Sequence, residues 1–288
     1  MSTGPDPDPP ALAQALAACG AGRTDVHEQA AGRRRPVRRF VGPGLVVDIA
    51  TGPHGQQLNL LELHGRRWAQ AAGLPTVRVL GADERAGDWL AGELVATAPA
   101  TGPAYLDHAL EVSARLARST PPAGGPGRTS WRAPRRTRPA RLARMVAAGV
   151  PLRQFSHVRA AAAGLPQVAV AHGDLTYRNL LHVEGTGAVT LVDWEYLGPA
   201  PAHVDELRLW STLKAPGDRA HLLDGLLRTL PQREHAAVGL LALWLCLRLF
   251  AENVAAPARD RDAADSAHAR AMAREAAGLA RELRAWPR

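Results

Sequence analysis

Residues 168–179 have the sequence VAVAHGDLTYRN, and residues 190–198 have the sequence TLVDWEYLG. In each stretch a short apolar run, typical of a buried strand, leads directly into polar residues. The first stretch supplies Asp174 and Asn179, and the second supplies Asp193. Polar groups that follow buried strands lie on loops at the edge of a core, where catalytic groups are usually mounted. We therefore expect these three residues to carry the chemistry.

These residue types suit phosphoryl transfer. The reaction needs cations that neutralise the phosphates, ligands that hold those cations, and a carboxylate that orients the attacking hydroxyl. Magnesium prefers oxygen ligands and keeps several waters, so one or two protein oxygens suffice. In this assignment Asp193 bridges the metal to the nucleotide, and Asn179 holds a second metal without adding charge. Asp174 is left to accept the proton of the acceptor.

The same segment carries a longer ordered pattern: His172-Gly173-Asp174-Leu175, Asn179, Asp193-Trp194-Glu195, Gly198 and Asp205. This pattern resembles the aminoglycoside phosphotransferase and choline kinase family, which are small-molecule kinases with a protein-kinase-like fold. The resemblance covers about residues 25–255. It implies that Asp174 is the catalytic base, that Asn179 and Asp193 are the metal ligands, and that the cofactors are ATP (or GTP) and Mg²⁺. It also implies that His172 and Asp205 brace the catalytic loop.

The implied architecture is α+β and two-lobed, with a small N-terminal antiparallel sheet lobe and a larger, mostly helical C-terminal lobe. We expect a disordered tail over residues 1–10, a nucleotide-binding lobe over residues 11–97, and a catalytic and acceptor-binding lobe over residues 98–288. An insert rich in Arg, Pro and Gly occupies about residues 121–139.

Apolar periodicity, Gly and Pro predict the individual elements. Strands are expected over residues 25–30, 37–41, 45–50, 77–80, 89–95, 167–171 and 188–192, with a hairpin turn at Gly42-Pro43-Gly44. Helices are expected over residues 11–19, 57–72, 104–118 and 140–163, and from residue 202 onward with breaks near Pro216, Pro231 and Pro257.

The first lobe departs from the family at its phosphate-binding lysine. The strand that should carry this lysine resembles residues 45–49, LVVDI, and Asp48 stands in the lysine position. The helix glutamate that would hold the lysine corresponds to Glu62, so two carboxylates would face each other where a cation belongs. At ~4 Å in a surface-like dielectric, like charges repel by about 4 kcal/mol. The pair must share a proton, bind a metal or take a cation from elsewhere.

The replacing cation is expected on the adjacent strand, which carries Arg38 and Arg39. Side chains on a strand alternate between faces, so one of these two arginines should point into the cleft. The alternative donors are Arg33 to Arg35, in a loop over residues 31–36 that would cover the phosphates. A shift in register, which leaves Asp48 exposed, is the competing interpretation; it restores no lysine, since the only one is Lys214.

Two further assignments leave an alternative open. Arg178 would point its guanidinium at the transferring phosphoryl group, or it is an ordinary surface arginine. Glu93, Leu94 and Val95 would form the hinge whose backbone meets the adenine edge, or they belong to an ordinary edge strand. Nothing in the sequence distinguishes ATP from GTP.

The distribution of charged residues along the chain indicates the charge of the acceptor. Residues 112–173 contain 11 arginines and no acidic residue, and residues 200–288 contain 11 acidic against 13 basic residues. An acid-rich pocket for a polycationic aminoglycoside is therefore not evident. We expect a neutral or acidic acceptor with a hydroxyl: a sugar, a nucleoside-like compound or another antibiotic natural product. The alternative acceptor is a Ser/Thr-bearing peptide precursor of a natural product, with an acidic leader on the arginine-rich insert.

A non-catalytic binding protein and a nucleic-acid-binding protein are the alternatives to an active kinase. Asp48 in the lysine position motivates a catalytically degenerate, kinase-like binding module. Nucleic-acid binding by the arginine-rich insert has no base-stacking pattern behind it, and we do not expect it. The two cysteines lie far apart, and the longest apolar stretch, residues 236–247, is too short to span a bilayer. We expect a cytoplasmic protein with no membrane partner.

Overall fold

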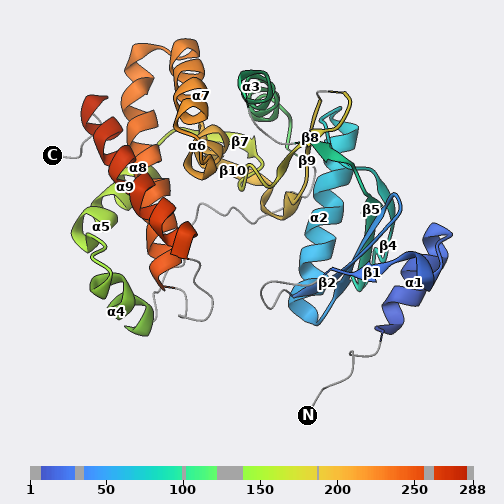
Figure 1. Ribbon diagram of the computed structural model, residues 1–288. Helices are drawn as coiled ribbons and strands as arrows, with labels where there is room; N and C mark the ends of the chain where they lie inside the picture. The colour runs from blue at the N-terminus through green and yellow to red at the C-terminus, as the bar shows by residue number, and fades with distance from the viewer. Residues whose placement is uncertain are drawn as a thin grey trace. The chain divides into compact units, whose positions relative to one another are not determined.

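The computed structural model describes residues 8–29, 36–98, 102–121, 139–186, 188–255 and 263–283 (Figure 1). Most of the expected N-terminal tail and nearly all of the arginine-rich insert lie outside these residues. The chain divides into two compact units: Met1–Pro99 with Leu181–Tyr196, and Ala100–Leu180 with Leu197–Arg288. The predicted α+β, protein-kinase-like fold class is confirmed.

The first unit is built on a five-stranded sheet whose neighbouring strands are all antiparallel. Its order is β1 (His27–Glu28), β2 (Val37–Gly42), β3 (Leu45–Ala50), β5 (Trp89–Glu93) and β4 (Val79–Ala82). The predicted hairpin is confirmed, because Gly42 pairs with Leu45 and leaves Pro43-Gly44 as the turn. Gly44 has a φ of 68°, a conformation that glycine adopts without steric cost.

The helix predicted over residues 11–19 is confirmed as α1 (Pro10–Cys19), and its apolar side covers the sheet. Leu12 and Leu16 of this helix pack into one core with Phe40, Val47 and Ile49 of the sheet. The helix ends at Gly20, whose left-handed φ of 68° closes the last turn.

Helix α2 (Pro53–Ala71) begins four residues before its predicted start. The unit also contains a three-stranded sheet in the order β6 (Thr97–Ala98), β8 (Leu180–Val183) and β9 (Val189–Leu191), followed by the 3-10 turn η2 (Trp194–Tyr196). Only β9 of these three strands was predicted. The other two contain two and four residues, which is too short for a period-two pattern.

The second unit is mostly helical. It contains α3 (Pro103–Ala117), α4 (Pro139–Ala147), α5 (Leu152–Ala163), α6 (Val204–Thr212), α7 (Pro216–Thr229), α8 (Gln232–Ala255) and α9 (Ala263–Glu282). Its antiparallel pair of strands is β7 (Gln167–Ala171) with β10 (Gly198–Pro201). The prediction of one helix over residues 140–163 is wrong. Gly149, with a φ of 76°, and Pro151 divide it into α4 and α5.

Helix α8 forms much of the core of the second unit. By length and composition alone it could cross a membrane, but 67% of its most apolar window is buried. It packs against α5, α6 and α9. Phe250 and Val254 share a core cluster with Met145 of α4 and Ala269 of α9. These contacts are those of a core helix.

Candidate active site

An arginine on β2 faces the aspartate that stands in the lysine position. The hairpin places Arg39 directly opposite Asp48. Nε and Nη2 of Arg39 donate to Oδ1 and Oδ2 of Asp48 at 2.7 and 2.8 Å. Asp48 is buried, with 8% of its surface exposed, so the prediction of a register that leaves it exposed does not hold. Such two-pronged pairs are the strong form of the charge-assisted hydrogen bond.

Arg38 lies on the opposite face of β2 and has a different partner. Its Nε and Nη2 donate to the Glu28 carboxylate of β1 at 2.9 and 2.7 Å. The alternation of side chains along a strand therefore separates the two candidate arginines. Arg39 is the one beside Asp48. Arg33 to Arg35 and the expected phosphate-covering loop lie outside the described residues.

Arg39 lies within electrostatic reach of three carboxylates. The hydrogen bonds of Asp48 raise the pKa of Arg39 above its ordinary value; burial opposes the shift, and the charges of Asp48, Asp193 and Glu62 add to it. Nε and Nη2 are engaged by Asp48. In the part of the chain that the structure describes, Nη1 has no hydrogen-bond partner. Arg39 thus keeps donors for an anion while it is held in place by Asp48.

Glu62 of α2 is compensated by an arginine of its own. Arg66, four residues further along the helix, donates from Nε to Glu62 Oε1 at 2.6 Å. Both residues are buried, each with 8% of its surface exposed. Asp48 and Glu62 are therefore each paired with a guanidinium of their own. Sequence reasoning missed Arg66, although the i,i+4 spacing from Glu62 signals such a pair.

The Glu62 carboxylate also holds the turn that carries Asp193. Its Oε1 accepts the Asp193 N–H at 3.1 Å, and its Oε2 accepts the Trp194 N–H. Asp193 has a φ of 70°, in the left-handed region, which is uncommon for a residue other than glycine. Such backbone is retained where the surroundings fix it, and it clusters at functional sites.

Trp194 anchors this turn in the core of the first unit. It is fully buried, and its Nε1 donates to Thr76 Oγ1 at 2.9 Å. A Cβ on Gly65 of α2 would overlap with Cβ of Trp194, so only glycine lets the helix approach the turn this closely.

In the second unit the structure brings Asp174 and Asn179 together. Nδ2 of Asn179 donates to the backbone oxygen of Asp174 at 2.8 Å and lies 3.4 Å from its Oδ2. This orientation turns Oδ1 of Asn179 away from Asp174. Among the described residues no donor reaches that Oδ1, so it is a suitable oxygen ligand for a cation.

Arg208 of α6 holds the side chain of Asp174. Both Nε and Nη2 lie 2.9 Å from Oδ1 of Asp174. The second oxygen, Oδ2, is the one near Asn179. Sequence reasoning missed Arg208, because no motif marks it; its position three residues after Asp205 on one helix is the only signal.

Asp205 fixes the backbone directly before Asp174. Its Oδ2 accepts the His172 N–H at 2.7 Å, and its Oδ1 accepts the Gly173 N–H at 2.9 Å. Burial raises the pKa of Asp205 to about 7, the charge of Glu206 adds to the shift, and the two backbone N–H groups oppose it. This geometry is that of a brace for the loop.

The remaining candidates are Arg178 and the expected hinge residues, Glu93 to Val95. Arg178 donates from Nε to the hydroxyl of Tyr177 at 3.0 Å and lies over its ring, a geometry that favours the surface-arginine interpretation. Glu93 ends β5, and the N–H of Leu94 bonds to Gly44 of the β2–β3 turn at 3.1 Å. Leu94 is exposed, and Val95 follows it outside the strand.

The side chains of Asn179 and Asp193 carry the oxygen atoms that a divalent cation prefers. Within the described residues no group of three or more His, Cys, Asp and Glu side chains could enclose an ion. Mg²⁺ commonly takes one or two protein oxygens and completes its shell with phosphates and water. The donor chemistry of Asn179 and Asp193 fits that ion.

The comparisons with known proteins identify the family of the chain. The model of the phosphotransferase enzyme family matches residues 26–250. The chain belongs to this phosphotransferase family. The resemblance inferred from the sequence is confirmed, and the protein is a phosphotransferase with an alcohol group as acceptor.

Solved structures share the fold of this phosphotransferase. A choline/ethanolamine kinase family protein from Mesorhizobium loti has a TM-score of 0.59 and 19% identity, covering 95% of this chain and 98% of that chain. The amicoumacin kinase hAmiN has a TM-score of 0.60 and 14% identity, covering 88% of both chains. A thermostable mutant of the aminoglycoside phosphotransferase APH(4)-Ia has a TM-score of 0.59 and 17% identity, covering 88% of this chain and 95% of that chain. The comparison with curated proteins finds no match.

Proposed function

We propose that this phosphotransferase is ATP- and Mg²⁺-dependent and transfers phosphate to a hydroxyl of a small molecule: a sugar, a nucleoside-like compound or another antibiotic natural product. The observation that carries the proposal is the position of Asp174. Arg208 holds one of its oxygens, and Asp205 holds the two residues before it. A carboxylate fixed in this way can orient an acceptor hydroxyl.

Asp174 would act as the base. Its Oδ1 is bound to Arg208, which leaves Oδ2 to receive the proton of the acceptor. The transition state of phosphoryl transfer is loose, so the reaction needs a well-placed proton acceptor more than a strong base. The hydrogen bonds of Asp174 supply that placement.

Asn179 and Asp193 would hold the metal. The metal supplies neutralisation of the charge on the phosphates. Asn179 contributes an amide oxygen that is turned away from Asp174, and Asp193 contributes a carboxylate on a turn held by Glu62. Glu62 fixes the backbone of Asp193, and the N–H of Asn179 donates to the backbone oxygen of Thr176 at 3.0 Å.

Arg39 would bind the phosphates in place of the missing lysine. In the family pattern the lysine lies on the strand now occupied by Asp48, and here the cation lies one strand over. The guanidinium is charged at every physiological pH and offers several donors in one plane. Because this cation is present, an active enzyme is favoured over a degenerate binding module. Glu93, Leu94 and Val95 are proposed for the adenine edge of ATP or GTP.

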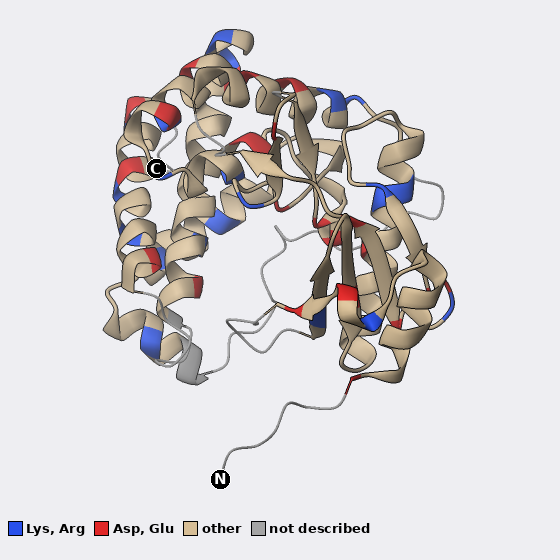
Figure 2. Ribbon diagram, turned by 45° about the vertical axis from the view of Figure 1, so that its right-hand side comes forward, with Lys and Arg blue, Asp and Glu red and all other residues tan. Residues whose placement is uncertain are grey.

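The charge of the second unit supports a neutral or acidic acceptor. Acidic and basic residues are interspersed along its helices (Figure 2). The 11 acidic residues of positions 200–288 are outnumbered by 13 basic ones. We propose a soluble acceptor in the cytoplasm; a Ser/Thr-bearing peptide is the second candidate, and nucleic acid is not proposed.

A transfer assay tests the function. Protein with Mg-ATP labelled at the γ-phosphate is incubated separately with neutral sugars, nucleosides, an acidic Ser/Thr peptide, choline and an aminoglycoside. We expect label on a neutral or acidic hydroxyl compound with wild type and none with Asp174→Asn. Label on no compound, together with ATP hydrolysis no faster than that of Asp174→Asn, would overturn the proposal. Preference for the aminoglycoside would overturn the acceptor class only.

A further inference from the structure

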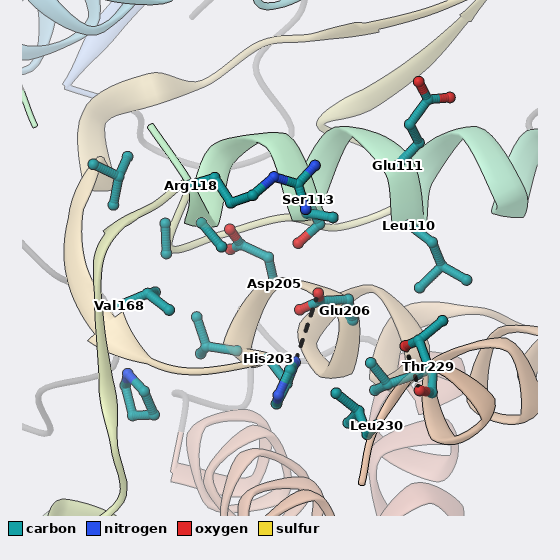
Figure 3. Close-up of a pocket in the computed structure, with 17 residues that line it drawn as sticks. Leu110, Glu111, Ser113, Arg118, Val168, His203, Asp205, Glu206, Thr229 and Leu230 are labelled. Atoms are coloured by element: carbon teal, nitrogen blue, oxygen red, sulfur yellow. Dashed lines mark hydrogen bonds and ion pairs between the residues drawn. The ribbon is translucent and has the colours of Figure 1, made fainter. Parts of the chain in front are cut away.

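A cavity of about 490 Å³ lies inside the second unit (Figure 3). It is lined by α3, β7, the turn between β10 and α6, the first turn of α6, and the end of α7. We call it the α3–α6 cavity. Asp174 is not among the residues that line it, so it is separate from the proposed acceptor position. Its volume is in the range of small-molecule sites.

Part of the wall of this cavity is apolar. It is formed by Leu110, Ala114, Val168, Val170, Leu226 and Leu230. Walls of this kind favour the burial of a hydrocarbon body, because they remove its surface from water.

Two buried polar side chains lie in the cavity with unfilled hydrogen-bonding capacity. Ser113 of α3 is 3% exposed, and within the described residues its hydroxyl has no hydrogen-bond partner. Glu206 of α6 is 8% exposed, and its only ion pair in that part of the chain is with Nδ1 of His203, at 3.9 Å. Figure 3 shows Ser113 and Glu206 on the inner sides of α3 and α6, whereas Glu111 points away. Both residues line the cavity, so these oxygens are available to a ligand that enters it.

Acidic and basic side chains both line the cavity. Asp205 and Glu206 are adjacent and buried, and Glu111 lines the outer side. The cations that line the cavity are Arg118, which is exposed at the end of α3, and His203, which carries charge only when protonated. Both oxygens of Asp205 accept backbone N–H groups, and the nearest cationic atom to Glu206 among the described residues is Nδ1 of His203 at 3.9 Å. Glu206 is therefore the carboxylate of this cavity that a cation from outside can join.

We propose that the α3–α6 cavity binds a small organic cation: one protonated amine on an apolar body. The ammonium group would donate to Glu206 and to the Ser113 hydroxyl, and the apolar body would lie against Leu110, Val168 and Leu230. Asp205 connects this cavity to the catalytic loop, because the same side chain accepts the His172 and Gly173 N–H groups. The proposal does not rest on the phosphotransfer roles given above.

The test is calorimetric titration of the full chain without nucleotide. The probes are cyclohexylmethylammonium chloride and cyclohexylmethanol, which have the same shape and differ in charge. We expect the ammonium compound to bind at least tenfold more tightly than the alcohol. The variant Glu206→Gln should lose at least tenfold in ammonium affinity. The control Glu282→Gln, which changes an exposed acid of the same unit, should bind as wild type does.

A second variant keeps the test decisive if Glu206→Gln does not fold. Ala114→Leu adds three carbons inside the cavity and leaves all charges in place, so it should abolish binding of both probes. Equal affinity of the two probes, no binding at millimolar concentration, or ammonium binding that survives both variants would each overturn the proposal. Because no nucleotide is present, these outcomes are independent of phosphotransfer.

Discussion

Arg39 and Asp48 face each other across the β2–β3 hairpin and form a two-pronged ion pair, with N–O distances of 2.7 and 2.8 Å. The pair explains how a chain with aspartate in the lysine position avoids two uncompensated carboxylates. The cation has moved to the neighbouring strand, and Glu62 has taken Arg66 as a partner of its own. The exchange preserves a positive group beside Glu62 and Asp193.

The first prediction concerns nucleotide binding by Arg39. Arg39→Ala should weaken the binding of Mg-ATP at least tenfold, because it removes a charge-assisted contact to phosphate worth about 1.5–3 kcal/mol. It should also lower the free energy of unfolding by about 2 kcal/mol, less than for a fully buried pair because Arg39 is partly exposed.

The double variant Arg39→Ala with Asp48→Ala separates these two effects. It should recover the unfolding free energy in urea, since no buried carboxylate is left alone, but not the affinity measured by calorimetry. Arg38→Ala is the matched control and should leave nucleotide affinity within twofold. Unchanged Mg-ATP affinity in Arg39→Ala would refute the substituted cation.

The second prediction concerns Arg208. Arg208→Ala should reduce kcat by about 30- to 150-fold, the equivalent of 2–3 kcal/mol, because Asp174 loses its fixed orientation. The KM for ATP should stay within threefold, and Arg208→Lys should recover part of kcat. Steady-state kinetics would measure both constants. Arg178→Ala should stay within threefold in kcat, and a larger loss there than in Arg208→Ala would reverse the assignment.

The third prediction follows from the buried carboxyl of Asp205. Its pKa in the folded chain is raised to about 7, whereas an unfolded aspartate titrates near 3.9. Between these values the folded state binds the extra proton, so the contribution of Asp205 to stability falls as pH rises from about 4 to about 7. As pH rises over this range, the free energy of unfolding measured in urea should therefore fall for wild type relative to Asp205→Asn. A relative gain would contradict the raised pKa.

The fourth prediction compares two glycines within helices. Gly65→Ala should lower the free energy of unfolding by about 1–3 kcal/mol, because the new Cβ overlaps with Trp194. Gly278→Ala meets no atom within 4 Å and should raise it by about 0.5–1 kcal/mol. Gly65→Ala should also reduce activity, since Trp194 carries the Asp193 turn. Equal stability changes in the two variants would rule out the close approach.

Much of the fold was predictable because its signals are local. The hairpin turn at Pro43-Gly44 also determines which arginine faces Asp48. Gly42 pairs with Leu45, so the residues three positions further along each strand, Arg39 and Asp48, pair as well. The order of Asp174, Asn179 and Asp193 along the chain indicated the family. These features depend on spacing along one or two elements, which a sequence displays directly.

The rest depends on contacts between distant segments. Arg208 lies 34 residues from Asp174, and Glu62 lies 131 residues from Asp193, so no local pattern joins them. Strands β6, β8 and β10 owe their existence to pairing partners rather than to their own sequence. The break between α4 and α5 did have local signals, Gly149 and Pro151, that the apolar periodicity around them obscured.

The most direct test of the central claim is the rate at which the γ-phosphate leaves Mg-ATP. The measurement compares wild type with Asp174→Asn and Asp193→Ala under the same conditions, without added acceptor and then with the best acceptor found. We expect Mg²⁺-dependent release of the γ-phosphate by wild type and a loss of at least 100-fold in both variants. Release at the wild-type rate by both variants would show that these carboxylates do not carry the reaction.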